Sequence, residues 1–276
     1  MTTTPTATTT YIAIDQNDCL ASMRSMPPEC VDLIVLDLPY GCTSAKWDRM
    51  IDPAALWVEL RRILTPRGTV LAFANQPFAT KLAAPAIDLL KYNLVWEKEK
   101  ATGHLHVRNR PLAIHEDILV FSHGAQIHEF ATKRRMTFNP DGEETGTTKL
   151  KLATSEIYRI FQGTEVGKKY TPLRNSTRSI LKFPKDGNAH PSQKPLALME
   201  WLILRYSNVG DAVFDPTMGS GSTGVAAVRA GRDFFGVEAD PKFFNIAGER
   251  IAEAMATLPP EASMFSGVKS TLVAAE

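Results

Sequence analysis

The chain has 276 residues, of which 44% are hydrophobic and 22% are charged, and this is the ordinary composition of a globular protein with one large core or two modest ones. No apolar run approaches the roughly 18 residues of a membrane span, and the Thr-rich start lacks the features of a signal peptide, so a cytoplasmic location is expected. Cys19, Cys30 and Cys42 form no CxxC pair. Their odd number argues against a disulfide framework or a metal site.

The formal net charge of +1 hides an uneven distribution along the chain. Residues 123–185 carry 12 Lys and Arg against 6 Asp and Glu, whereas the rest of the chain carries 19 against 24. A basic segment on a mildly acidic body indicates an insert that binds a polyanion. A merely solvated basic surface would show the same charge run.

The first part of the chain alternates apolar strands with helical patterns. Residues 1–10 are Thr-rich and are expected to be disordered. The pattern then predicts strands at 11–14, 31–36, 69–73, 93–97 and 117–122, helices at 19–26, 53–64 and 78–90, and a loop at 41–49. This alternation predicts an α/β fold with a mostly parallel, doubly wound sheet covered by helices.

The alternation fails after residue 122 and returns near residue 189. Helices are predicted at 196–206, 225–230 and 241–255, and strands at 212–214 and 233–237. The sequence therefore predicts a catalytic domain made of residues 11–122 and 189–257. Residues 123–188 are predicted to be an inserted target-recognition region.

The strand predicted at Val31–Leu36 ends in a group of chemically useful residues. Asp37 follows the strand at the position where open α/β sheets bind ligands. Pro39 has no N–H and biases Leu38 away from the helical conformation, so the Leu38 carbonyl is left as a second acceptor. With Tyr40 beside them, two acceptors and a ring suit the exocyclic amino group of a nucleobase. A loop in which Asp37 only caps a turn would have the same residues.

A second constellation lies late in the chain. Gly219, Gly221 and Gly224 satisfy GxGxxG between a predicted strand and a predicted helix, and Glu238 ends the following strand. Such glycines let a nucleoside cofactor approach the backbone, and the carboxylate suits ribose hydroxyls. The pattern alone fits a dinucleotide equally well, so a nicotinamide-dependent dehydrogenase stays open at this point.

The order of the motifs resembles that of the β group of DNA amino-methyltransferases, which use S-adenosylmethionine. Segment 37–40 is similar to the family's Asp-Pro-Pro-Tyr motif, segment 215–223 to its Gly-rich loop, and segment 190–195 to the stretch before the first helix of the cofactor site. The resemblance covers residues 11–122 and 190–255. It implies a permuted, Rossmann-like methyltransferase fold.

The resemblance also implies the reaction, the partners and the site residues. It implies a site-specific methyltransferase acting on the N6 amino group of an adenine flipped from double-stranded DNA, with no metal and no membrane involved and a homodimer left open. The implied catalytic residues are Asp37, Leu38, Pro39 and Tyr40; the cofactor residues are Asp18, Cys19, Asp37, Lys194, Asp215, Thr217, Gly219, Gly221, Ser222, Thr223 and Glu238; and the DNA-binding residues are Lys133, Arg134, Arg135, Lys168 and Lys169.

Several alternatives remain open from the residues themselves. An N4-cytosine amino group offers the same geometry, and a non-catalytic DNA-binding module is a third class. Asp18 could simply cap a helix, and Lys194 could simply be solvated. At Leu38 the family usually has proline, but only the carbonyl is needed there, so activity is expected to survive. Cytosine C5 methylation is disfavoured, because none of the cysteines follows a proline.

Overall fold

The computed structural model describes residues 10–39, 50–126, 135–144, 146–149, 169–170, 173–186 and 193–257. The predicted loop at 41–49 and most of the Thr-rich lead lie outside these residues. Thr10, the last residue of that lead, is described and is only 5% exposed. No helix of the described residues is long and apolar enough to cross a membrane.

An eight-stranded sheet forms the centre of the protein, in the order β1-β12-β11-β2-β3-β5-β4-β10. Its strands are β1 (Ile12–Asp15), β2 (Val31–Leu36), β3 (Leu64–Ala74), β4 (Leu90–Thr102), β5 (Ala113–Ser122), β10 (Ile180–Lys182), β11 (Ala212–Asp215) and β12 (Asp233–Val237). Strand β5 is antiparallel to both of its neighbours, and every other pair is parallel. The predicted mostly parallel α/β fold is confirmed.

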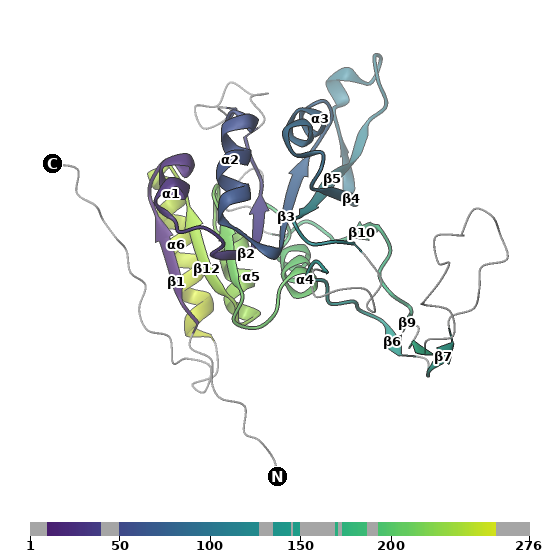
Figure 1. The fold of residues 1–276 in the computed structure, drawn as a ribbon. Helices are drawn as coiled ribbons and strands as arrows, with labels where there is room; N and C mark the ends of the chain where they lie inside the picture. Colours follow the sequence, from purple (N-terminus) through teal and green to yellow (C-terminus); the bar gives the residue numbers. More distant parts are fainter. Residues whose placement is uncertain are drawn as a thin grey trace, which may run out of the picture.

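Helices cover both faces of the sheet (Figure 1). One face packs against α1 (Cys19–Ser25), α2 (Pro53–Ile63) and α3 (Phe78–Ala83), and the other against α4 (Leu196–Tyr206), α5 (Ser222–Arg229) and α6 (Pro241–Ala256). Alternate residues of β2 serve the two faces: Leu33 and Val35 belong to one core cluster, and Ile34 and Leu36 to the other. Burial on both sides explains why the strand reads as an almost unbroken apolar run.

Aspartate residues begin three of these helices. The carboxylates of Asp18, Asp52 and Asp240 accept hydrogen bonds from backbone N–H groups in the first turns of α1, α2 and α6. Proline occupies the first turn of α2 and α6, where its missing N–H has no cost. Asp18 therefore caps α1, and its predicted role in cofactor binding stays a prediction.

The helix predicted at 78–90 is wrong in its second half. Helix α3 ends at Ala83, a short 3-10 helix η1 (Ala84–Ala86) follows, and β4 already begins at Leu90. Pro85 has no N–H to continue the helical hydrogen bonds, so the apolar pattern outlasts the helix. Strands β4 and β5 are also longer than predicted and are joined through a second 3-10 helix, η2 (His104–His106).

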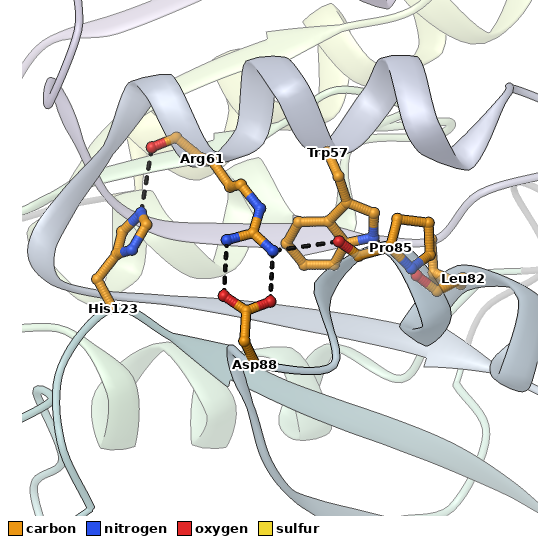
Figure 2. Close-up of polar contacts among 6 residues, drawn as sticks. All are labelled: Trp57, Arg61, Leu82, Pro85, Asp88 and His123. Carbon is orange, nitrogen blue, oxygen red and sulfur yellow. Dashed lines mark hydrogen bonds and ion pairs between the residues drawn. The ribbon is translucent and has the colours of Figure 1, made fainter.

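Polar contacts join α2 to α3 and to the segment that follows α3 (Figure 2). The Arg61 guanidinium donates to both carboxylate oxygens of Asp88, at 2.6 and 2.9 Å, and to the Pro85 carbonyl at 3.1 Å. The buried Trp57 indole N–H donates to the Leu82 carbonyl at 2.7 Å. These contacts hold α2 against the segment that leads into β4.

Parts of the predicted insert are built into the main body. Strand β10 extends the central sheet by pairing with β4, Met136 is buried in the core at 3% exposed, and the Asn139 amide donates to the carbonyls of Leu204 and Ser207 at the end of α4. Two small antiparallel pairs complete the described part of this region: β6 (Glu143–Glu144) with β9 (Leu173–Arg174), and β7 (Thr148–Lys149) with β8 (Lys169–Tyr170). The domain boundaries at 123 and 188 stay predictions.

Candidate active site

Four parallel strands deliver acidic residues to one edge of the sheet. Asp15 and Asp215 end β1 and β11, and Asp37 and Glu238 follow the ends of β2 and β12. Hydrogen bonds join the ends of these strands: the Glu238 N–H donates to the Asp15 carbonyl at 3.1 Å, and the Thr217 hydroxyl donates to the Asp37 carbonyl at 3.2 Å. The two predicted constellations therefore meet at one edge, as expected of a parallel sheet.

The Gly-rich loop is held by Glu238 and by α6. The Glu238 carboxylate accepts from the backbone N–H groups of Gly219 and Asp240, at 2.9 Å each. Gly219 and Gly221 have φ values of +53° and +78°, which disfavour residues with a side chain. A Cβ at Gly221 would lie 2.9 Å from the Ala247 Cβ, whereas a Cβ at Gly219 would meet nothing within 4 Å. Gly221 thus allows the loop to pack on α6, and the space beside Gly219 is open.

Asp215 is the most deeply placed carboxylate of this edge, at 3% exposed. It accepts hydrogen bonds from the Thr217 N–H at 3.1 Å and from the Thr223 hydroxyl. Burial raises the pKa of Asp215 to about 7, and the charges of Asp37 and Glu238 add to the rise. Asp215 therefore organises the loop and sits close to its titration point at neutral pH.

The hydroxyl group of Ser222, at the end of the Gly-rich loop, is available to a ligand. Its side chain is 8% exposed at the start of α5, and its hydroxyl has no hydrogen-bond partner among the described residues. A buried hydroxyl without a partner is costly unless a ligand or water satisfies it. With the open space at Gly219 and the carboxylate of Glu238, the residues present fit a nucleoside-containing cofactor.

Asp37 takes part in a row of alternating charges that includes two residues not singled out in the sequence. Lys194 Nζ donates to Asp37 Oδ1 at 2.6 Å and lies 3.6 Å from Glu116 Oε1, and Lys98 Nζ lies 2.9 Å from Glu116 Oε2. Lys194 also lies over the Phe73 ring, 4.8 Å from its centroid. The signal in the sequence was the charged Glu116 at the start of an apolar strand.

The charges of this row shift one another's titration. Burial raises the pKa of Asp37, and Lys194 acts against that rise. Burial disfavours the charged form of Lys194, but Asp37 and Glu116 outweigh it and raise the pKa of Lys194 above its usual value. Lys194 is therefore a buried ammonium, 8% exposed, and the solvated alternative is wrong.

The remaining residues of the catalytic motif are only partly described. The Leu38 side chain is 4% exposed and packs in the core cluster on the side of α1 and α2. No hydrogen bond to the Leu38 carbonyl occurs within the described residues. Pro39 is half-buried, and Tyr40 lies outside the described residues.

Asp18 and Cys19 lie at the start of α1, which follows the carboxyl end of β1. Asp18 accepts from the Ala21 N–H at 3.0 Å, and Cys19 is 6% exposed. Burial, followed by the charge of Asp18, raises the pKa of Cys19 to about 11, so its thiol stays protonated at neutral pH. The structure places both residues near the predicted edge.

The predicted DNA-binding residues are mostly outside the described chain, which is the case for Lys133, Arg134 and Lys168. Arg135 is described, and its carbonyl accepts from the Arg67 guanidinium at 3.0 Å. Lys169 belongs to β8.

The fold and the site together define an enzyme of the methyltransferase class that uses a nucleoside-containing cofactor. The defining features are a helix-covered sheet, a Gly-rich loop, a carboxylate after the next strand and an Asp-Leu-Pro segment after a neighbouring strand. The chain belongs to the DNA methylase family of N6 and N4 amino-methyltransferases, whose family model matches residues 31–249. The β-group resemblance and the cofactor predicted from the sequence, S-adenosylmethionine, are confirmed.

Individual relatives agree with this assignment. The chain is 28% identical over 264 residues to the DNA adenine methyltransferase YhdJ of Escherichia coli (strain K12). The alignment covers 86% of this chain and 82% of that protein. Among solved structures, the M1.HpyAVI complex with SAM shares 24% identity with a TM-score of 0.56, covering 87% of this chain and 99% of that one. The cytosine-N4-specific PvuII DNA methyltransferase shares 15% identity with a TM-score of 0.60, covering 88% and 87%. These two structures share the fold.

Proposed function

We propose that this DNA methyltransferase transfers the methyl group of S-adenosylmethionine to the N6 amino group of an adenine flipped out of duplex DNA. The observation that carries the proposal is the pair of unused acceptors beside the cofactor cradle. Lys194 donates a hydrogen bond to Asp37 Oδ1, whereas Asp37 Oδ2 and the Leu38 carbonyl accept no hydrogen bond within the described residues. The preference for adenine is supported by the name of the relative YhdJ.

The two acceptors suit the two hydrogens of an amino group. Asp37 Oδ2 and the Leu38 carbonyl each accept one N–H, and both draw electron density onto the nitrogen. S-adenosylmethionine supplies an electrophilic methyl group when bound. The amino nitrogen would form a bond to that methyl group as the methyl–sulfur bond breaks, and it would release one proton. Asp37, which accepts a hydrogen bond from the amino group and whose pKa is raised by burial, would receive that proton. Tyr40 stacks on the flipped base.

The charge row keeps Asp37 in one position. Lys194 fixes Oδ1, and Glu116 and Lys98 fix Lys194 from behind. Asp37 follows β2 and Lys98 belongs to β4, so the sheet holds both ends of this row of charges. The free oxygen of Asp37 is therefore already oriented toward the incoming base, and the side chain does not need to reorganise during the reaction. Catalysis then comes mostly from positioning and electrostatics.

The cofactor is held by the loop and the neighbouring strand ends. Glu238 binds the ribose hydroxyls; although both of its oxygens accept backbone N–H groups, each has a second lone pair. Ser222 donates its otherwise unpartnered hydroxyl, and Asp18 and Cys19 line the adenine end. Lys194 approaches the methionine carboxylate from its place beside Asp37. The remaining contacts come from Asp215, Thr217, Gly219, Gly221 and Thr223.

The basic residues of the insert hold the DNA. Lys133, Arg134, Arg135, Lys168 and Lys169 neutralise phosphates, which sets the salt dependence of binding and leaves sequence reading to other groups.

The deciding experiment is methylation of unmodified genomic DNA by the purified protein with S-adenosylmethionine, followed by sequencing that distinguishes N6-methyladenine from N4-methylcytosine. N6-methyladenine at one recurring sequence is expected, and Asp37→Ala protein serves as the inactive control. N4-methylcytosine would assign the enzyme to the other branch of the family. Absence of any modified base, with calorimetry showing tight binding of NAD and none of S-adenosylmethionine, would refute the proposal.

A further inference from the structure

Strands β4 and β5 continue beyond the sheet as a two-stranded ribbon. Strand β10 pairs with β4 only at Val95–Glu97, and β3 pairs with β5 only as far as Asp117. Past the pair Glu97 and His115, no other described strand pairs with β4 or β5. The pairing between β4 and β5 shifts register there before Thr102 pairs with Ala113 near the tip. Figure 1 shows this hairpin standing out from the body of the protein. We refer to residues 98–114 as the ribbon.

The ribbon extends beyond the edge of the sheet that is formed by the carboxyl ends of the parallel strands, where the candidate active site lies. Leu36, the last residue of β2, pairs with Ala72, which pairs with Leu119, which pairs with Asn93. Strand β4 runs in the same direction as β2 and continues to Thr102, nine residues beyond Asn93. At about 3.3 Å per residue, less the shortening from twist and bulges, the tip stands roughly 20–30 Å above the level of Asp37. DNA whose base enters the site must pass beside it.

The tip combines an exposed apolar residue with free cations. Leu105 is 97% exposed and Val107 is 58% exposed, although burying either would be favourable. Lys100, Arg108 and Arg110 are exposed and have no ion pair or side-chain hydrogen bond within the described residues. Only backbone hydrogen bonds among residues 103–110 shape the turn. Among the residues that the structure describes, none makes a side-chain hydrogen bond or ion pair with Lys100, Arg108 or Arg110.

We propose that the ribbon lies in a groove of the DNA beside the target base, with Lys100, Arg108 and Arg110 on phosphates and Leu105 packed against the base pairs next to the extruded nucleotide. A two-stranded β-ribbon fits the major groove of B-DNA, and Leu is among the residues that proteins insert against unstacked base steps. Leu105 thereby lowers the free-energy cost of extruding a paired base. This inference rests on the proposed function, and it adds a DNA-contacting element outside the predicted insert.

The phosphate contacts are tested through the salt dependence of DNA binding. In B-DNA, each phosphate contact contributes about 0.9 to the slope of log affinity against log salt. Arg108→Ala/Arg110→Ala protein should therefore lose about 2 from the slope. Arg24→Ala is the matched control, because Arg24 is exposed at the end of α1, toward the opposite edge of the sheet. An unchanged slope for the double variant would overturn the assignment of Arg108 and Arg110 to DNA phosphates. It would favour binding of a protein partner by these exposed cations instead.

The role of Leu105 is tested by single-turnover methyl transfer on two duplexes that carry the methylated sequence. In one the target base is paired, and in the other it faces an abasic position, where extrusion is already easy. Leu105→Ser should slow transfer on the paired duplex by about tenfold and match the parent on the abasic duplex. Val209→Ser, at a residue that is 67% exposed between α4 and β11, should match the parent on both.

The outcomes separate this inference from the function on which it rests. Leu105→Ser protein that matches the parent on the paired duplex, or that is equally slow on both duplexes, would overturn the ribbon's role while leaving the methyltransferase intact. Parent protein that binds no DNA would overturn both. The side chain is fully exposed, so circular dichroism should show the same melting temperature for variant and parent.

Discussion

Lys194 Nζ lies 2.6 Å from Asp37 Oδ1, although 157 positions separate the two residues in the chain. The ion pair joins the segment before α4 to the end of β2, and Glu116 of β5 supports it from the other side of the ammonium group. Three separate parts of the sequence thus set the charge and the orientation of one carboxylate. The free oxygen of that carboxylate is the group on which the proposed reaction depends.

Replacing Asp37 should remove methyl transfer while DNA binding changes little. Asp37→Asn keeps the size of the side chain but loses the negative charge that draws electron density onto the amino nitrogen, so a fall in single-turnover rate of at least about a hundredfold is expected. Rates and DNA affinity would be measured side by side, with Asp88→Asn as a control at an exposed carboxyl. Near-normal turnover of Asp37→Asn would reject the assignment.

Leu38 should matter for stability more than for chemistry. Its side chain is buried in the core, so Leu38→Ala should lower the free energy of unfolding by about 2–4 kcal/mol, and Leu38→Met should cost much less. Leu38→Pro retains the carbonyl but loses part of the packing. Urea unfolding and single-turnover rates at low temperature would separate the two effects. A folded Leu38→Ala protein as slow as Asp37→Asn would show that the side chain takes part in the reaction.

Glu116→Gln should move the pH profile of kcat/KM to lower pH on both limbs. The negative charge of Glu116 raises the pKa of both Lys194 and Asp37, so its loss lowers both values. Glu97→Gln is the matched control, because Glu97 pairs with Lys182 at 3.2 Å near the surface. A profile that falls in height without moving would indicate a purely structural role for Glu116.

The free energy of unfolding of Asp215→Asn protein, relative to that of the parent, should increase as the pH rises from about 4 to 7. In that range the folded protein holds a proton on Asp215, whose pKa is raised to about 7, while the unfolded chain does not. Rising pH therefore lowers the stability of the parent, whereas the amide does not titrate. A relative gain on the order of 1–3 kcal/mol is expected in urea unfolding at pH 7 compared with pH 4.5.

The control for this experiment is Asp88→Asn. The hydrogen bond from Arg61 lowers the pKa of Asp88 to about 2, so this variant should show no gain at neutral pH. A stability difference for Asp215→Asn that does not change with pH would contradict the raised pKa.

Trp57→Phe should destabilise the protein by about 1–3 kcal/mol. The change removes the N–H that satisfies the buried Leu82 carbonyl and leaves that carbonyl without its partner (Figure 2). Val58→Ala, at a residue that is 65% exposed on the same helix, should change stability by less than about 0.5 kcal/mol. Thermal melting of both variants would check the expectation, and equal melting temperatures would contradict it.

The sequence by itself determined the fold class and the location of the two constellations. Apolar runs such as Val31–Leu36 and the helix starts at Asp52 and Asp240 depend on local patterns, which a single sequence displays. The glycine spacing and the carboxylate that ends the next strand are equally local. The permuted order of the motifs followed from their positions in the chain.

Only the tertiary structure decided how the charges meet. Pro85 is a local signal for the early end of α3, which the helix predicted at 78–90 overlooked, whereas no spacing pairs Lys194 with Asp37 or places Glu116 behind them. The exposure of Leu105 likewise depends on how far β4 and β5 outrun their neighbours. Contacts between distant segments depend on the register of the strands and on burial, and both are properties of the assembled sheet.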